Sequence, residues 1–264
     1  MIYNLPRKKR KRITNYLTFS SPNPFSISVA TPGWNGKLYY SKDTKTWVKW
    51  TGNEVNATEA DGTYALYFRG TRSTKIAGGS SNKWTLSGSN ISCTDNIENL
   101  LDYETVEAGQ HPTMADYCYS YMFRGCTSLT TAPSLPATTL APRCYYYMFY
   151  GCTSLTTAPS LPATTLADYC YYSMFGGCTS LTTAPSLPAT TLANYCYSYM
   201  FNGCTSIKLA ISKSREYDKE YRIPKSGNGV TATNALTDMF TQTGGTFAET
   251  PSINTTYYTS NTIV

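Results

Sequence analysis

Nine cysteines are the residues whose type and spacing most directly suggest chemistry in this sequence. Eight of them recur in two series with a spacing of 26 residues. The first series is Cys118, Cys144, Cys170 and Cys196, and the second is Cys126, Cys152, Cys178 and Cys204. Cysteine zinc sites use pairs separated by about two to four residues, whereas seven residues separate each pair here. The spacing therefore predicts ladders of cysteines in a repeated structural core and no metal centre.

Only some of these cysteines could form disulfide bonds. Stacked helices lie about 10 Å apart, whereas bridged cysteines need Cα atoms within about 7 Å, so Cys144, Cys170 and Cys196 are predicted to stay reduced. Neighbouring strands lie about 4.8 Å apart, which leaves bridges open for Cys152, Cys178 and Cys204. The odd total of nine and the lack of an export signal favour free, buried thiols.

A single histidine limits the catalytic chemistry that the chain can perform. His111, Asp116 and Cys118 lie close in sequence and have the residue types of a cysteine protease. Cys118 nevertheless occupies a repeated structural position, and no signal of an oxyanion site accompanies the three residues. Gly-rich phosphate loops before a helix are absent, and the repeats hold almost no paired carboxylates for glycoside hydrolysis. We therefore expect a protein that is not an enzyme and that has no cofactor and no metal.

A short basic arm accounts for the formal net charge of +6. Its six contiguous charges are Arg7, Lys8, Lys9, Arg10, Lys11 and Arg12. The other Lys and Arg residues equal the 16 Asp and Glu residues in number, so the rest of the chain is neutral. Such an arm can contact nucleic-acid phosphates, anchor the chain to another protein, or remain a solvated tail. The sequence leaves these three roles open.

Tyrosine is the residue type most suggestive of a binding surface. The repeats place tyrosines on a face with almost no charge, and the candidate ligand surface is Tyr121, Tyr146, Tyr147, Tyr150, Tyr172 and Tyr199, with Tyr169 and Tyr195 beside them. Exposed tyrosines suit contact with protein or glycan, although sequence drift on a tolerant face would give the same pattern. Thr131, Thr157 and Thr183 recur identically, so a ligand bound there is expected to be repetitive.

The candidate tyrosines, the threonines and the two cysteine series lie in an internal repeat. Its run TSLTTAPSLPATTLA begins at Thr127, Thr153 and Thr179. In one unit the apolar residues that never vary are Leu140, Ala141, Cys144, Tyr145, Met148 and Phe149, which share one face of a helix. Gly151 is placed to end that helix. The β-branched stretch 154–159 predicts one short strand. A strand and a helix every 26 residues predict a solenoid.

The repeat resembles the BspA-like class of bacterial leucine-rich repeats. The resemblance is carried by the residues 123–129, with the sequence FRGCTSL, by their three downstream equivalents, and by the Leu-Pro pairs that begin at Leu135, Leu161 and Leu187. It covers roughly residues 96–264. Proteins of this kind occur on bacterial surfaces and among predicted structural proteins of gut bacteriophages. The resemblance implies a leucine-rich-repeat fold, and binding or display rather than chemistry.

We therefore predict an α+β multidomain protein. Residues 1–13 form an extended basic arm. Residues 14–93, with short alternating runs and regular turns, form an antiparallel β-sandwich. Residues 94–264 form a leucine-rich-repeat solenoid, divided into a leading cap at 96–117, regular repeats at 118–207, a charged insertion at 208–229 and a degenerate C-terminal cap at 230–264.

The favoured function is that of a non-enzymatic structural and binding protein of a bacteriophage virion, of the fibre, head-decoration or tail-tip type. No stretch approaches the roughly 20 apolar residues that span a bilayer, and no apolar signal segment follows the arm. A virion would reconcile a surface-type repeat with the absence of an export signal. In this interpretation the arm and the β-domain contact other virion proteins, and the solenoid contacts a host-surface polymer or protein. A bacterial cell-surface adhesin and a nucleic-acid-binding protein that uses the arm are the alternatives, and homo-oligomerisation is left open.

Overall fold

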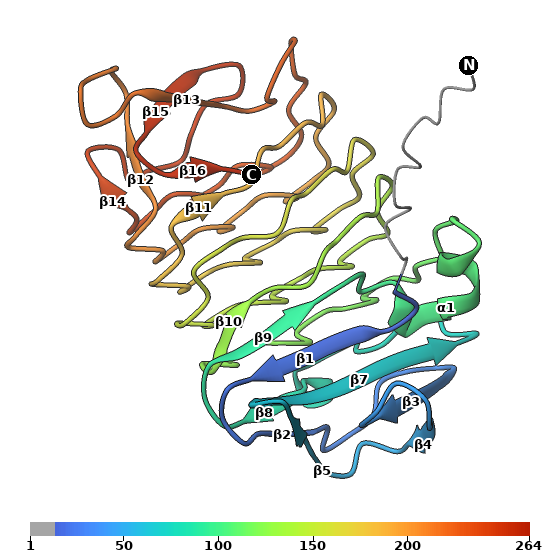
Figure 1. Ribbon diagram of the computed structural model, residues 1–264. Coiled ribbons are helices and arrows are strands. Elements are labelled where there is room, and N and C mark those ends of the chain that lie inside the picture. The colour runs from blue at the N-terminus through green and yellow to red at the C-terminus, as the bar shows by residue number, and fades with distance from the viewer. Residues whose placement is uncertain (1–13) are drawn as a thin grey trace, which may run out of the picture.

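Strands and turns dominate the computed structural model, which describes residues 14–264 (Figure 1). Within these residues the one α-helix is α1 (Asn99–Glu107), and a short 3-10 helix lies at Ser80–Asn82. The predicted α+β class, with a helix in every repeat, is therefore wrong. The described residues contain no helix that is both long enough and apolar enough to cross a membrane.

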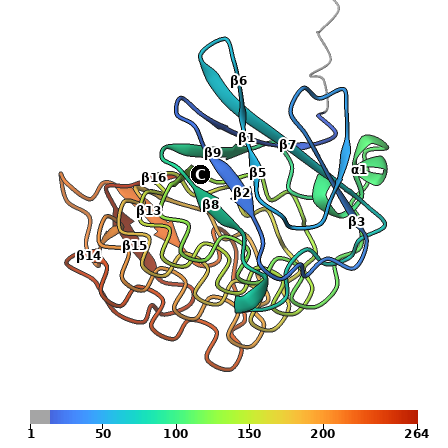
Figure 2. The same ribbon diagram turned by 90° about the horizontal axis from the view of Figure 1, so that it is seen from below.

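Two sheets are built from the first part of the chain. The larger sheet contains β1 (Leu17–Ser21), β3 (Lys37–Ser41), β4 (Val48–Trp50), β6 (Thr58–Ala60), β7 (Thr63–Thr71), β9 (Ile91–Thr94) and β10 (Leu129–Thr131), in the order β10-β9-β1-β7-β3-β4 with β6 paired to β7. The smaller sheet contains β2 (Ser26–Ser28), β5 (Val55–Asn56) and β8 (Thr85–Ser87) in the order β5-β2-β8. All pairs are antiparallel except β9 with β10. The β6–β7 hairpin projects from the remainder (Figure 2).

An aromatic cluster joins these sheets to the repeats. In β1 and β7 alternate side chains are buried, as expected for strands with one face against a core. Phe19 of β1 lies 6.0 Å from Trp84 and 6.1 Å from Phe123 of the first repeat, measured between ring centroids. Because β9 also pairs with β10 of the repeats, the hydrophobic core continues from the sheets into the repeats without a break.

The helix α1 packs against the C-terminal end of β7. The amide of Ser73 donates to the carbonyl of Leu101 at 3.0 Å. Gly70 makes the approach possible, because a Cβ there would meet the Leu100 carbonyl oxygen at 1.7 Å. Any larger residue at position 70 would push the helix off the sheet.

Each 26-residue repeat forms one coil, and residues 111–241 form a stack of such coils, called here the coil stack (Figure 1). Along each coil the backbone amides donate in turn to a carbonyl on the next coil and to a carbonyl in their own coil. Tyr145 donates to Cys170 on the next coil at 3.0 Å, whereas Met148 donates back to Tyr145 within its own coil at 3.2 Å. This pattern runs from Arg143 to Cys152 and recurs in the neighbouring copies. In this stretch half of the backbone hydrogen bonds therefore close turns, and half join successive coils.

Left-handed backbone conformation at every fourth residue replaces the predicted helix. Arg143, Tyr147 and Gly151 have φ values of 54°, 53° and 71°, and a right-handed helix admits none of these. The hydrogen bonds within the coil consequently span three residues instead of four. The leucine-rich-repeat solenoid of alternating strands and helices is wrong, because each predicted helix is a chain of consecutive turns.

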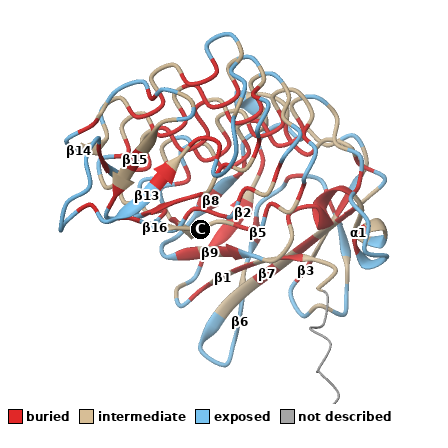
Figure 3. Ribbon diagram, turned by 90° about the horizontal axis from the view of Figure 1, so that it is seen from above, coloured by how far each residue is buried: buried red, intermediate tan, exposed pale blue. Residues whose placement is uncertain are grey.

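Side chains inside the coil stack form columns of identical or similar residues. Adjacent phenylalanine rings in the column Phe123, Phe149, Phe175, Phe201 and Phe240 lie 5.5 to 5.7 Å apart and nearly parallel. A second column contains Tyr119, Tyr145, Tyr171 and Tyr197, at 5.7 to 5.8 Å. All these rings are buried, whereas exposed residues gather at the corners of the coils (Figure 3). Stacked aromatic columns contribute a large part of the buried apolar area that stabilises the coils.

The C-terminal part of the chain adds small sheets at the far end of the stack. Four strands, β12 (Lys208–Ala210), β13 (Lys219–Arg222), β14 (Gly244–Gly245) and β15 (Thr256–Thr259), pair in the order β13-β15-β12-β14. The last strand, β16 (Thr262–Ile263), returns to pair in parallel with β11 (Thr183–Ala184). The segment 208–229, predicted as an insertion, thus supplies β12 and β13 to this end of the molecule.

Candidate functional site

One surface of the coil stack gathers the eight predicted tyrosines, and Tyr117 in addition, into adjoining columns, and we call it the tyrosine surface. It contains Tyr117, Tyr121, Tyr146, Tyr147, Tyr150, Tyr169, Tyr172, Tyr195 and Tyr199. Tyr121 and Tyr147 stack at 5.4 Å between centroids, and Tyr169 and Tyr195 stack at 4.6 Å. Tyr146 packs edge-on against Tyr147 at 4.6 Å, which joins neighbouring columns. The surface is therefore a connected aromatic layer rather than a set of independent side chains.

Two arginines are the cations of this layer, and each lies over tyrosine rings. The guanidinium carbon of Arg143 lies 5.2 Å from the Tyr117 centroid and 4.6 Å from that of Tyr169. Arg124 lies 5.8 Å from Tyr121 and 5.6 Å from Tyr150. These contacts are within the range of cation–π attraction. The arginines thus extend the aromatic layer instead of interrupting it.

Exposure across the tyrosine surface is partial. Tyr150 has 37% of its area exposed, and the other eight tyrosines are half-buried by one another. Tyr150 lies over Gly176, where a Cβ would meet its ring at 2.9 Å. Partial burial raises the pKa of Tyr172 to about 12, and the neighbouring Tyr147 and Tyr199 add to that effect. The surface therefore offers ring edges and neutral hydroxyl groups to a partner at physiological pH.

The predicted threonine ladder is not uniform in the structure. Thr157 is exposed and Thr131 is half-buried, and the two form an isolated parallel bridge. Thr183 is buried at 8% exposure, pairs with Thr262 of β16, and accepts the amide of Ala158 at 2.6 Å through its Oγ1 atom. The three threonines therefore do not form one continuous binding surface.

A different threonine ladder is exposed at another corner of the coils. Its members are Thr138, Thr139, Thr164, Thr165, Thr190 and Thr191. Thr139 bridges Thr165, and the Leu140 amide donates to the Thr165 carbonyl at 3.0 Å. These threonines were not singled out from the sequence, although their repetition as Thr-Thr pairs in three copies is visible there.

All nine cysteines are free and buried. In the second series the thiols donate across coils, so that Cys152 Sγ contacts the Phe123 carbonyl at 3.0 Å, and Cys178 and Cys204 repeat the arrangement at 3.1 and 2.9 Å. Burial raises the pKa of all nine thiols, to about 12 for Cys126, Cys196 and Cys204. The described residues contain no group of three or more His, Cys, Asp or Glu placed to hold a metal ion.

We expect the folded protein to resist thiol-modifying reagents. Only the thiolate reacts, and burial removes both the thiolate and the access that a reagent needs. Labelling near pH 8 should therefore require unfolding. The rate of labelling of the folded protein should be at least about a thousandfold lower than the rate in denaturant. Mass spectrometry after timed exposure to iodoacetamide checks this, with the denatured chain in the same buffer as the reference. A thiol that reacts equally fast in both samples would contradict the burial described.

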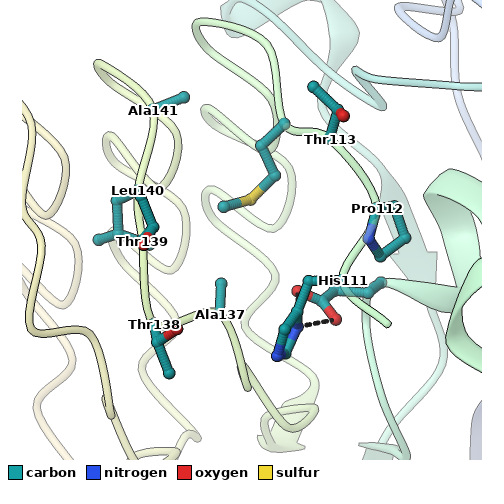
Figure 4. A pocket seen from close by; sticks show the side chains of 10 residues that line it. His111, Pro112, Thr113, Ala137, Thr138, Thr139, Leu140 and Ala141 are labelled. Carbon is teal, nitrogen blue, oxygen red and sulfur yellow. Dashed lines mark hydrogen bonds and ion pairs between the residues drawn. The ribbon is translucent and has the colours of Figure 1, made fainter. Parts of the chain in front are cut away.

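His111 pairs with a buried carboxylate rather than with the cysteine near it in sequence. Its Nδ1 atom lies 2.8 and 3.0 Å from the two carboxylate oxygens of Glu98. The Glu98 side chain is 1% exposed, whereas that of His111 is 52% exposed. Burial raises the pKa of Glu98, and the hydrogen bond and charge of His111 oppose that shift. Both line a cavity of about 340 Å³ whose wall includes neither Asp116 nor Cys118 (Figure 4), so the protease-like cluster does not assemble.

The remaining sequence-derived site is the basic arm, which lies outside the described residues. Glu98 was not singled out from the sequence, because a lone glutamate 13 residues from the histidine carries no pattern. Comparison with known proteins gives no match to a family model, to a curated protein or to a solved structure. The resemblance to BspA-like repeats therefore stays a prediction, and the leucine-rich-repeat architecture that it implied is corrected above.

Proposed function

We propose that the chain is a non-enzymatic binding protein whose tyrosine surface contacts an extended partner with a repeated structure. The observation that carries the proposal is the connected layer of nine tyrosines and two arginines on successive coils. Tyrosine supplies large contact area with little loss of side-chain entropy on binding, because it has few rotatable bonds. In this layer the rings are already held by their neighbours, which lowers that cost further.

The spacing of the surface supports a repeated ligand. Each of the four coils contributes two or three tyrosines to the surface. The coils are joined by backbone hydrogen bonds like those between strands, which places equivalent positions about 4.8 Å apart. A glycan or a fibrous protein presents equivalent groups along one direction and can engage several coils at once. Each contact is weak alone, and several in series give useful affinity.

The setting that we propose is the surface of a bacteriophage particle, where the arm and the first sheets attach to other virion proteins and the coil stack faces the host. A bacterial cell surface is the alternative setting. Both rest on the sequence resemblance, and the comparisons support neither. Antibody raised against residues 96–264 tests the first, because the epitope should appear on purified particles, and label confined to host cells would contradict it.

Substitution within the tyrosine columns tests the binding surface. The double variant Tyr146→Ser/Tyr147→Ser should fold normally, because Ser198 and Ser173 already occupy the same two columns on other coils. We expect it to lower binding of the labelled protein to intact bacterial cells by at least about tenfold, the effect of losing a central aromatic contact. Tyr258→Ser, at a half-buried position on β15, is the matched control.

The same cells stripped of surface polysaccharide separate glycan from protein as the partner. Retained binding of the wild-type chain favours a protein, and lost binding favours a glycan. Equal binding by the wild type, the double variant and Tyr258→Ser would show that the tyrosine surface is not the contact site.

A further inference from the structure

The cavity that contains Glu98 and His111 lies between the first two coils of the stack. His111, Pro112, Thr113 and Met114 form one wall, and Ala137, Thr138, Thr139, Leu140 and Ala141 form the other (Figure 4). The two walls occupy equivalent positions 26 residues apart, so that His111 stands where later coils have Ala137, Ala163 and Ala189. Those three alanines are buried, with 4% exposure or less. The histidine is thus a departure from the repeat, confined to its first coil.

The backbone at this corner is open. Between the second and third coils the Thr164 and Thr165 amides donate to the Thr138 carbonyl, and Leu140 donates to Thr165. Across residues 14–264 no equivalent bond joins Thr113 or Met114 to Thr138 or Thr139, and the first amide that links the two coils belongs to Tyr117. The corner between Thr165 and Thr191 also lacks these bonds, but its column holds alanine and no ionisable pair. The first corner alone combines an open backbone with ionisable side chains.

Glu98 has unused hydrogen-bonding capacity at this cavity. A carboxylate accepts about four hydrogen bonds. His111 contacts both Glu98 oxygens through a single nitrogen, and a hydrogen bond with Asn96 also lowers the pKa of Glu98. In the neutral imidazole a proton on Nδ1 faces Glu98 and leaves Nε2 as an acceptor. The Thr138 and Thr139 side chains are exposed on the opposite wall, and Met114, Ala137 and Leu140 supply apolar surface. The cavity therefore combines several acceptors with a small apolar wall.

We propose that this cavity binds a single sugar ring or a similar uncharged polyol. Hydroxyl groups of the ligand donate to Glu98 and to His111 Nε2, the threonine hydroxyls bond to its other oxygens, and its C–H face lies against Met114 and Leu140. A volume of about 340 Å³ is at the lower end of small-molecule sites. A metal ion does not fit, because the cavity supplies one histidine and one carboxylate, and the described residues hold no larger cluster. This site is separate from the tyrosine surface and does not depend on the function proposed for it.

The single histidine gives a direct measurement, because the full chain contains one imidazole signal in its NMR spectrum. The probes are the methyl glycosides of glucose, galactose, mannose and N-acetylglucosamine, with sodium acetate and ethylammonium chloride as anionic and cationic comparators. We expect at least one glycoside to shift the His111 signal saturably, with a Kd of about 1 mM, as for other small ligands with few atoms. The two comparators should produce no saturable shift.

Variants locate the binding. Thr139→Val keeps the side-chain volume, removes one hydroxyl and should weaken the glycoside at least about fivefold. Thr191→Val changes the same column at a distant corner and should leave the affinity unchanged, and Tyr146→Ser/Tyr147→Ser should also leave it unchanged. Circular dichroism checks that each variant is folded. Absence of a saturable shift with every glycoside, a shift with acetate or ethylammonium alone, or equal losses in Thr139→Val and Thr191→Val would overturn the proposal.

Discussion

Raising the pH above about 10 is expected to unfold the protein in one steep transition, because many buried groups resist deprotonation together. Burial raises the pKa of all nine thiols and of five fully buried tyrosines, namely Tyr119, Tyr145, Tyr171, Tyr197 and Tyr221. The unfolded chain releases these protons first as the pH rises. The stabilisation is therefore complete below the ordinary pKa values of about 8.5 for cysteine and 10 for tyrosine, and it is lost as the pH rises toward the raised values.

The expected size of this effect is large. Each group contributes about 1.4 kcal/mol per pH unit between its unfolded and folded pKa. Even five such groups would remove about 7 kcal/mol per unit, comparable with the whole free energy of unfolding of a typical domain. Circular dichroism and the ultraviolet absorbance of tyrosinate, followed together against pH, should change at the same midpoint. Gradual formation of tyrosinate with an unchanged circular dichroism spectrum up to about pH 12 would contradict the prediction.

A single substitution sharpens this test. The Tyr145 hydroxyl is buried and has no hydrogen-bond partner. Tyr145→Phe removes both an unsatisfied polar group and an ionisable one, so it should stabilise the protein at neutral pH by about 1–3 kcal/mol and move the alkaline midpoint upward. Tyr258→Phe makes the same chemical change at a half-buried position and should leave the midpoint in place.

Removing one whole repeat should leave a folded protein, whereas removing half of one should abolish folding. Deletion of residues 153–178 brings Thr179 directly after Cys152, so every column keeps its register, with Phe149 next to Phe201 and Tyr145 next to Tyr197. Repeat stability is a sum of units and of contacts between neighbours, and the shortened chain loses one coil and one interface. Deletion of residues 153–165 instead brings Pro188 and Ala184 to the positions that Phe175 and Tyr171 occupy in the two columns, and it leaves no set of matching coils.

Thermal unfolding and one-dimensional NMR of the two shortened chains provide the measurement. The chain that lacks 153–178 should unfold cooperatively at a reduced Tm, and the chain that lacks 153–165 should show no transition and narrow amide dispersion. Comparable folding of both chains would show that the register of the columns does not determine the structure.

The sequence was sufficient to place the buried side chains of each repeat, but not to define its backbone. Cys144, Tyr145, Met148 and Phe149 are all buried, as their spacing indicates. Their spacing is four residues, and a helix turns about 400° in four residues, so the pattern drifts from one helical face by only about 40° per step. Over three steps a helix and a chain of turns present almost the same apolar pattern.

The feature that separates the two structures is backbone handedness, and the residue types conceal it. Gly151 fits a left-handed conformation, and its role as a helix terminator gave the same expectation. Arg143 and Tyr147 adopt that conformation at φ values of 54° and 53°, although a non-glycine residue there costs about 1–2 kcal/mol. Hydrogen bonds between coils and ring stacking between Tyr121 and Tyr147 offset that cost, and both depend on neighbouring copies rather than on local sequence.

The candidate sites divide in the same way. Copy-to-copy variation identified the tyrosines that the structure gathers on one surface, since side chains on that surface are free to change. Burial of Thr183 depends on its pairing with Thr262 of β16, which lies 79 positions further along the chain. The pair of Glu98 with His111 depends on how α1 meets the first coil. Neither contact leaves a repeat or a spacing from which it could be inferred.

Because backbone hydrogen bonds join successive coils, the distance between the two ends of the coil stack can change only in fixed increments. One end of the coil stack continues into the sheet of β1, β7 and β9, and the other end carries β12 to β15. Each added or removed coil would separate those ends by a further step of about 4.8 Å, or bring them closer by the same amount, while the surfaces at both ends stay unchanged. The number of repeats therefore sets the distance between the first sheet and the C-terminal strands.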